Sequence, residues 1–287
     1  MSVHPAPFIV GVGRSGTTLL RLMIDAHPEL AIPPETHFLP RLLALTGGGE
    51  ALREAMYVVM TSESTWADFG ISHGSLTEAF ARVAPFTLAG GLRAFYGLYA
   101  HRFGKQRWGE KTPFYGRSMR AIEIVLPVAH FLHVIRDGRD VALSLRPLWF
   151  SPGYDIDAQA RNWLSKVSAI RAGGRQCHRY LEIRYEDLVF DTESVLRRIC
   201  DFIALEYNSR MLSYHEGARK RLDEMGDDYV FKGTHIGKEP RVQLHVNTLR
   251  PPDPQRVGRW RKEMTTEERE TFASIAGVLL SELGYET

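Results

Sequence analysis

The sequence has few cysteines, no long apolar run and almost no net charge. Cys177 and Cys200 are its only cysteines and lack Cys-x-x-Cys spacing, which argues against a disulfide framework and a zinc site and fits a reducing, cytoplasmic compartment. No stretch approaches about 18 consecutive apolar residues, and no charged region precedes an apolar run at the N-terminus. We therefore expect no membrane span and no signal peptide. A formal net charge of +2 indicates no nucleic-acid partner.

The apolar runs that are present alternate between strand and helix patterns. Hydrophobic residues make up 44% of the 287 residues and charged residues 24%, as in an ordinary globular enzyme with a large core. Residues 8–12 form a short apolar run that predicts a buried strand, and strands are also predicted at residues 130–135 and 180–185. Helices are predicted after them, at residues 17–26, 137–148 and 193–203. This alternation predicts an α/β fold, a parallel sheet flanked by helices, in a single domain over residues 1–287.

The remaining segments predict further helices and one long loop. Residues from about 42 to 107 are helical in pattern and form an insertion between strands. Helices are also predicted at 35–45, 157–176 and 266–283, and a short strand at 30–32. Residues 226–254 are rich in glycine, proline and polar residues, which indicates a long loop. A loop of this length is more often functional than idle.

The first strand leads into a glycine-rich turn that fits two phosphate-binding patterns. Gly11, Gly13 and Gly16 spell G-x-G-x-x-G, and Glu35 follows 19 residues after Gly16, near the distance expected in a dinucleotide site. That acid, however, follows two prolines rather than a full strand. The same glycines also spell a G-x-x-x-x-G-T-T phosphate loop in which Thr17 replaces the usual lysine. A backbone N–H cradle at a helix N-terminus still suits an anion.

The residues of this loop and of a second motif resemble a known family. GRSGTTLL, residues 13–20, resembles the 5′-phosphosulfate loop of the sulfotransferases that use 3′-phosphoadenylyl sulfate (PAPS). VIRDGRDVALSL, residues 134–145, is similar to their 3′-phosphate signature, with Arg136 at a strand end and Ser144 eight residues later. The similarity to tyrosylprotein sulfotransferases and their bacterial relatives continues through PPETHFLPR, EKTPF, IRYEDLV and RWRKEM. It implies the sulfotransferase fold, PAPS as donor, 3′,5′-ADP as product and no metal.

The resemblance also implies roles for individual residues. Glu35 matches the general base and Lys111 the lysine that steadies the departing oxygen. The cofactor-binding residues it implies are Arg14, Ser15, Gly16, Thr17, Thr18, Arg136, Ser144, Tyr185, Arg259, Trp260 and Lys262, with Arg146 near enough to Ser144 to help. A partner serine of the family has no clear match, although Thr234 or residues 238–247 lie in its region.

The acceptor is the least determined part of the prediction. The resemblance implies that the helical insertion over about residues 42–107 shapes the acceptor side, and that a late loop over about residues 226–262 contacts cofactor and acceptor. Arg41 matches a basic position that holds acidic peptide in the family, whereas His37 replaces a second arginine there. This loss of fixed charge favours a hydroxyl or amine on a small molecule, carbohydrate, lipid or bacterial peptide. Two other functions stay open: a kinase that uses ATP and magnesium, and a non-catalytic nucleotide-binding module. The sequence does not indicate the oligomeric state, so a homodimer stays open too.

Overall fold

A four-stranded parallel sheet forms the centre of the chain, as predicted. The computed structural model describes residues 4–287. Its main sheet has the strand order β4-β1-β5-β6, with every neighbouring pair parallel; the strands are β1 (Ala6–Gly11), β4 (Glu110–Lys111), β5 (Ala129–Ile135) and β6 (Tyr180–Arg184). The α/β fold in one domain is confirmed. Strand β4 is only two residues long, too short for an apolar pattern to indicate.

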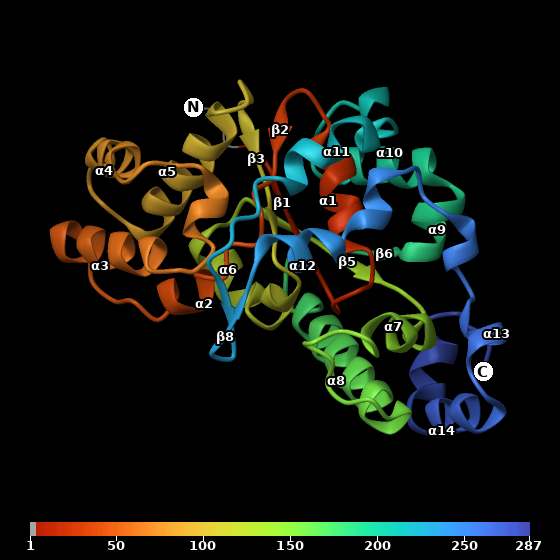
Figure 1. The fold of residues 1–287 in the computed structure, drawn as a ribbon. Coiled ribbons are helices and arrows are strands. Elements are labelled where there is room, and N and C mark those ends of the chain that lie inside the picture. The colour runs from red at the N-terminus through yellow and green to blue at the C-terminus, as the bar shows by residue number, and fades with distance from the viewer. Residues whose placement is uncertain (1–3) are drawn as a thin grey trace.

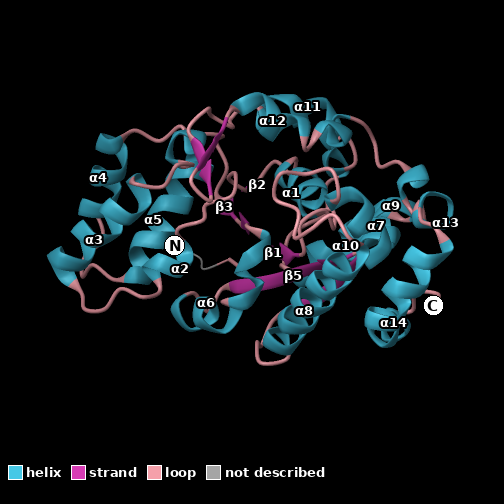
Figure 2. Ribbon diagram, turned by 60° about the horizontal axis from the view of Figure 1, so that its bottom comes forward, coloured by secondary structure: helices cyan, strands magenta, loops and turns pink. Residues whose placement is uncertain are grey.

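Both faces of this sheet are buried by helices. Phe8, Val10 and Phe131 pack into one core with α5 (Leu88–His101) and α6 (Met119–Val125). Ile9 and Leu132 face a second core with α1 (Thr17–Asp25), α9 (Tyr185–Phe190), α10 (Thr192–Phe202) and α11 (Tyr214–Leu222). This alternation follows from the two-residue period of a strand. Figure 2 shows α8 (Ile156–Gly174) on one side of β1 and β5 and α1 on the other. Because both faces are covered, the central strands β1 and β5 are mainly apolar, which makes them recognisable in the sequence.

The helices mostly agree with the predicted ranges. Those that build the two layers are α1 (Thr17–Asp25), α6 (Met119–Val125), α7 (Gly138–Leu145), α8 (Ile156–Gly174), α9 (Tyr185–Phe190), α10 (Thr192–Phe202), η3 (Ser209–Met211), α11 (Tyr214–Leu222) and α14 (Thr266–Glu282). Polar side chains fix several of their starts: Asp155 caps α8, and Thr265 forms a capping box with Glu268 at α14. These caps stand directly before the apolar pattern begins.

The helical insertion forms one end of the molecule, away from α13 (Trp260–Glu263) and α14 (Figure 1). It contains α3 (Gly49–Thr61), η1 (Trp66–Phe69), α4 (His73–Ala81) and α5 (Leu88–His101), and a two-stranded parallel sheet of β2 (Leu30–Ala31) and β3 (Arg107–Trp108) lies beside it. Phe38, Phe69 and Phe95 pack edge-to-face in its core. This aromatic packing joins the insertion to the sheet through Tyr96, whose ring lies 6.5 Å from that of Phe8.

Two segments differ from the sequence prediction. The helix expected over 35–45 is reduced to α2 (Leu39–Leu42), because His37 adopts a left-handed backbone with φ of 59°. The late segment is not one open loop. It contains a hairpin of β7 (Tyr229–Phe231) and β8 (Thr234–Ile236), then α12 (Lys238–Gln243), η4 (Val246–Leu249), η5 (Pro254–Arg256) and α13 (Trp260–Glu263). Elements of three to six residues leave too little periodicity to be predicted.

Candidate active site

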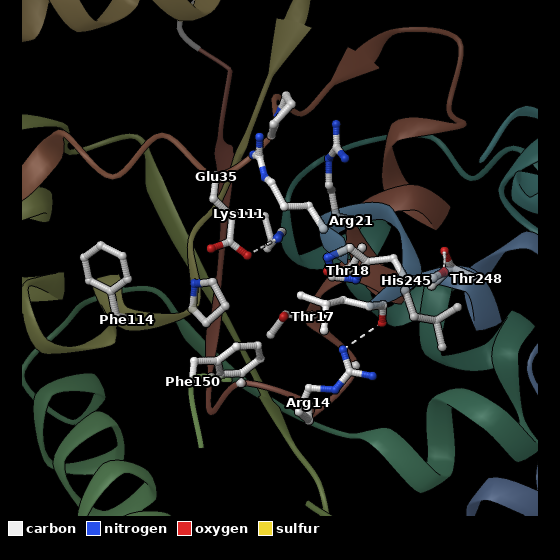
Figure 3. Close-up of a pocket in the computed structure, with 18 of the residues that line it drawn as sticks. Arg14, Thr17, Thr18, Arg21, Glu35, Lys111, Phe114, Phe150, His245 and Thr248 are labelled. Atoms are coloured by element: carbon white, nitrogen blue, oxygen red, sulfur yellow. Dashed lines mark hydrogen bonds and ion pairs between the residues drawn. The ribbon is translucent and has the colours of Figure 1, made fainter. Parts of the chain in front are cut away.

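A large cavity lies at the carboxyl ends of β1, β4 and β5, where parallel α/β sheets generally bind ligands. Its volume of about 930 Å³ is near the upper end of typical ligand sites. The lining comes from the loop after β1, from η2 (Pro113–Arg117), from the segments after β2 and α7, and from the late segment. Segments from most of the chain therefore meet at one place (Figure 3).

The loop after β1 is built to bind an anion. Gly16 is the N-cap of α1 with φ of 98°, and no side chain caps the helix. Arg14 also has a positive φ, of 72°. Left-handed residues at such spacing turn successive backbone N–H groups inward, and an uncapped helix N-terminus adds its dipole. Thr17 and Thr18 line the cavity at this point, and the buried Ser15 hydroxyl has no hydrogen-bond partner among the described residues.

Arginines from three segments gather next to this loop. Arg14 Nε donates to Ser144 Oγ at 3.1 Å, and Arg136 Nη1 donates to the Arg14 carbonyl oxygen at 3.2 Å. Burial, followed by the charges of Arg136 and Arg256, lowers the pKa of Arg14 to about 10. Asp140 is the acid nearest to Arg136, at 3.6 Å. Several buried cations in one cluster require negative charge nearby, so an anionic ligand fits this cluster.

Tyr185 closes the same corner of the cavity. Its ring lies under the Arg136 guanidinium at 4.4 Å, and a Cβ added to Gly16 would approach it to 2.5 Å. The tyrosine thus packs directly on the phosphate-loop backbone, which requires glycine at that position. The predicted cofactor residues of the first loop, Arg136, Ser144 and Tyr185 are brought together.

Glu35 and Lys111 form an ion pair in this cavity, with 2.5 Å between Oε1 and Nζ (Figure 3). Lys111 ends β4, and its side chain is 4% exposed, against 30% for Glu35. Burial lowers the pKa of Lys111, an effect that Glu35 opposes. Burial alone would raise the pKa of Glu35, but Lys111 and His37 hold it below its ordinary value. Glu35 is therefore ionised at neutral pH and able to accept a proton.

Comparison with known proteins identifies the family of the chain. A profile of the sulfotransferase family matches residues 5–209. The chain belongs to the sulfotransferase family. Protein-tyrosine sulfotransferase 1 of Danio rerio is 28% identical over 98% of this chain and 72% of its own length.

Solved structures support the fold of this sulfotransferase. The sulfotransferase domain from the Synechococcus PCC 7002 olefin synthase has a TM-score of 0.61 at 24% identity, covering 99% of this chain and 95% of that domain. Mouse sulfotransferase SULT7A1 complexed with PAP has a TM-score of 0.51 at 14% identity, covering 98% of this chain and 88% of that one. The resemblance found in the sequence motifs is thus confirmed at the level of family and fold.

A buried carboxyl group in the sulfotransferase holds the ion pair in place. Glu110 is 1% exposed and accepts hydrogen bonds from Thr112 Oγ1 at 2.6 Å, Tyr96 Oη at 2.7 Å and Thr36 Oγ1 at 3.2 Å. The Thr36 amide also donates to Thr112 Oγ1 at 3.1 Å. Because Thr36 follows Glu35 and Thr112 follows Lys111, these bonds clamp together the two segments that carry the ion pair.

The late segment reaches the arginine cluster through a different residue from those predicted. Arg256 lines the cavity, and its carbonyl oxygen accepts a hydrogen bond from Arg136 Nη2 at 2.6 Å. Arg259 pairs instead with Glu263 at 2.6 Å, and the structure does not place Arg259, Trp260 or Lys262 at the main cavity. Arg256 lies three residues before Arg259 in the same basic stretch, which is the signal that could have identified it.

A buried carboxylate explains this difference. Asp140 accepts hydrogen bonds from the backbone N–H of Gly258 at 2.8 Å and of Trp260 at 3.0 Å. These bonds fix the turn between Arg256 and α13 and hold Trp260 at 5% exposure, where the Arg139 guanidinium stacks on its ring at 3.5 Å. Trp260 therefore positions the turn from outside the cavity.

The structure also shows which other residues of the late segment and of the end of α7 reach the cavity. Arg146 pairs with Glu268 at 2.6 Å and does not line the cavity, and neither does Thr234. His245 does, and so do Arg241, Leu244, Asn247 and Thr248. Burial and then the charges of Lys111 and Arg14 hold the pKa of His245 well below its ordinary value, so its ring is neutral beside the anion site. No periodicity in the sequence pointed to this histidine.

Of the two residues predicted to bind the acceptor, only His37 lines the cavity. His37 lines the cavity, stacks on Phe114 with 5.4 Å between ring centroids, and lies 3.6 Å from Glu35. Burial lowers its pKa, which leaves it neutral at neutral pH. Arg41 does not line the cavity, because it pairs with Glu63 at 2.6 Å.

Two further findings concern membrane-spanning helices and metal-binding groups. Over residues 4–287, no helix combines the length and apolar character needed to cross a membrane. Within the same range, no group of three or more histidine, cysteine, aspartate or glutamate residues is arranged to hold a metal ion.

Proposed function

We propose that this sulfotransferase takes its sulfuryl group from PAPS and transfers it to a hydroxyl or amine of a bound acceptor. The observation that carries the proposal is one cavity holding two anion sites and an ion pair: the α1 N-terminus, the cluster of Arg14, Arg136 and Arg256, and Glu35 with Lys111. A donor with a 3′-phosphate and a 5′-phosphosulfate on one ribose matches two neighbouring anion sites. The PAP bound to the mouse sulfotransferase supports the same choice.

Different residues of the chain would bind the 5′-phosphosulfate and the 3′-phosphate of such a donor. The loop from Arg14 to Thr18 would hold the 5′-phosphosulfate on its N–H groups, and Arg136, Ser144 and Arg256 would hold the 3′-phosphate. Tyr185 would pack against the nucleotide beside Arg136. When bound, PAPS supplies an activated sulfuryl group on a phosphate that leaves readily.

The ion pair supplies the proton transfer and the charge stabilisation. Glu35 Oε accepts the proton of the attacking acceptor hydroxyl, since its lowered pKa keeps it ionised. The ammonium of Lys111 stabilises negative charge on the departing oxygen as the bond to sulfur breaks. The two charges neutralise each other at 2.5 Å, which reduces the cost of holding both in a buried site.

Replacing Glu35 by glutamine tests this assignment. The Glu35→Gln enzyme should bind 3′,5′-ADP nearly as well as the wild type and lose about 100-fold or more in turnover, the range for losing a general base. The exposed Glu29, which does not line the cavity, gives the matched control Glu29→Gln. Retention of wild-type turnover in Glu35→Gln would remove Glu35 from the role of base.

A further inference from the structure

Aromatic rings line the Glu35 side of the cavity, and one of them, Phe150, also lies beside Gly13 of the phosphate loop. Phe114 and Phe150 lie on the Glu35 side in Figure 3, whereas His245 and Thr248 lie opposite. The rings form a continuous series of contacts: His37 with Phe114 at 5.4 Å and with Tyr229 at 5.8 Å, then Trp149 with Tyr229 at 6.2 Å, with Phe150 at 4.8 Å and with Phe231 at 4.8 Å. We call these six residues the aromatic wall.

The wall retains exposed apolar surface within a concave site. Phe114 is 46% exposed and Trp149 is 40% exposed, although both line the cavity. Each aromatic side chain can bury roughly 150–250 Å² when covered. Four separate segments contribute rings here, so the surface is suited to cover a flat apolar group.

The charges near the wall do not suit an acidic peptide. Arg41 is paired with Glu63 and lies outside the lining. Arg241 lines the cavity but is paired with the buried Asp68. His37 is neutral. The exposed Lys232 lies 5.5 Å from the Phe231 ring but outside the cavity lining. Within the lining, Arg241 is therefore paired and His37 is uncharged.

Two cations of the same cavity lack an acid. Arg117, at the end of η2, and Lys166, in α8, both line the cavity, and neither side chain forms an ion pair or a hydrogen bond with the described residues 4–287. The two segments pack tightly here, because a Cβ added to Gly116 would lie 2.5 Å from Ile170, one helical turn after Lys166. Burial and then the charge of Arg117 lower the pKa of Lys166. A carboxylate between them would remove this repulsion through charge-assisted hydrogen bonds.

We propose that the acceptor is an aromatic hydroxy compound that carries a carboxylate, with its ring against the aromatic wall and its carboxylate at Arg117 and Lys166. This assignment rests on the proposed sulfuryl transfer and names the acceptor class for it. The acceptor hydroxyl lies at Glu35, and its proton passes to the Glu35 carboxylate while the oxygen forms the bond to sulfur. The phosphate oxygen of the donor leaves with the electron pair of the broken bond.

A matched series of acceptors tests the proposal. The probes are 4-hydroxybenzoate, 4-hydroxyphenylacetate and 3-(4-hydroxyphenyl)propionate, each compared with its neutral amide, with PAPS as donor. The acid should exceed the amide at least tenfold in kcat/KM for one or more lengths. Lys166→Gln should reduce that ratio to below about threefold, whereas Arg175→Gln, an exposed residue at the end of the same helix and outside the lining, should leave the ratio unchanged.

Other results would overturn the acceptor class. Amides that match the acids, a hexose that exceeds every phenol, or a strongly acidic tyrosine peptide that exceeds them all would each contradict it. Binding of 3′,5′-ADP, measured in the same preparations, separates the two levels of the account. If 3′,5′-ADP binds and no hydroxyaryl acid is sulfated, only the acceptor proposal fails; if 3′,5′-ADP does not bind, the proposed function fails as well.

Discussion

Replacing Glu110 by glutamine should flatten the pH dependence of stability between about pH 5 and pH 8. Burial raises the pKa of Glu110 from 4.5 to about 7, although Thr112, Tyr96 and Thr36 donate hydrogen bonds that oppose the rise. The folded state therefore binds this proton more tightly than the unfolded state. The resulting stabilisation is fully present below about pH 4.5 and is lost as the pH rises through 7.

The size of this effect follows from the shift. A difference of between two and three pKa units, at about 1.4 kcal/mol per unit, amounts to about 3 kcal/mol across the window. For a chain of this length that corresponds to roughly 5 °C in Tm. Groups that titrate elsewhere change little between wild type and variant, so the difference between the two proteins isolates Glu110.

The assay is thermal unfolding of both proteins at half-unit pH steps from 5 to 8. The wild type should lose about 3 kcal/mol more than Glu110→Gln over that range. A second variant, Tyr96→Phe, removes the 2.7 Å hydrogen bond that Tyr96 donates to the Glu110 carboxylate. Its stability should therefore fall more steeply with pH than that of the wild type. Parallel curves for wild type and Glu110→Gln would refute the reasoning.

Two further predictions concern the nucleotide side. Arg136→Ala should weaken the binding of 3′,5′-ADP at least tenfold more than the binding of 5′-AMP. Arg256→Ala should have the same effect, whereas Arg259→Ala should have a much smaller one. Titration calorimetry checks this, and equal losses for both nucleotides would contradict the 3′-phosphate assignment. Gly16→Ala should destabilise by about 1–3 kcal/mol and impair 3′,5′-ADP binding, because a Cβ there meets the Tyr185 ring at 2.5 Å with φ at 98°. Gly97→Ala, in α5 with no atom within 4 Å of the added Cβ, is the control, and an equally stable Gly16→Ala would be the contrary result.

The parts of the site that follow strands could be predicted from the sequence. The loop after β1 and the stretch after β5 come directly after buried apolar runs, so their place at one sheet edge follows from the parallel order. The family resemblance then placed Glu35 and Lys111, which the structure brings within hydrogen-bonding distance although they lie 76 residues apart.

Features that depend on tertiary contacts could not be predicted. The turn that brings Arg256 rather than Arg259 to the cavity depends on Asp140, more than 110 residues earlier, binding the backbone of Gly258. Helix α2 starts late because His37 is left-handed and the Thr36 amide is bound to Thr112. Neither contact leaves a local pattern in the sequence. The neutral His245 and the aromatic wall come likewise from segments that meet only in the fold.

The most direct test of the central claim is calorimetric binding of 3′,5′-ADP, 5′-AMP and ATP with magnesium to the wild-type protein. Two anion sites in one cavity predict that 3′,5′-ADP binds at least tenfold more tightly than 5′-AMP, and does so without metal. Tight binding of ATP with magnesium, together with weak binding of 3′,5′-ADP, would contradict PAPS as the donor.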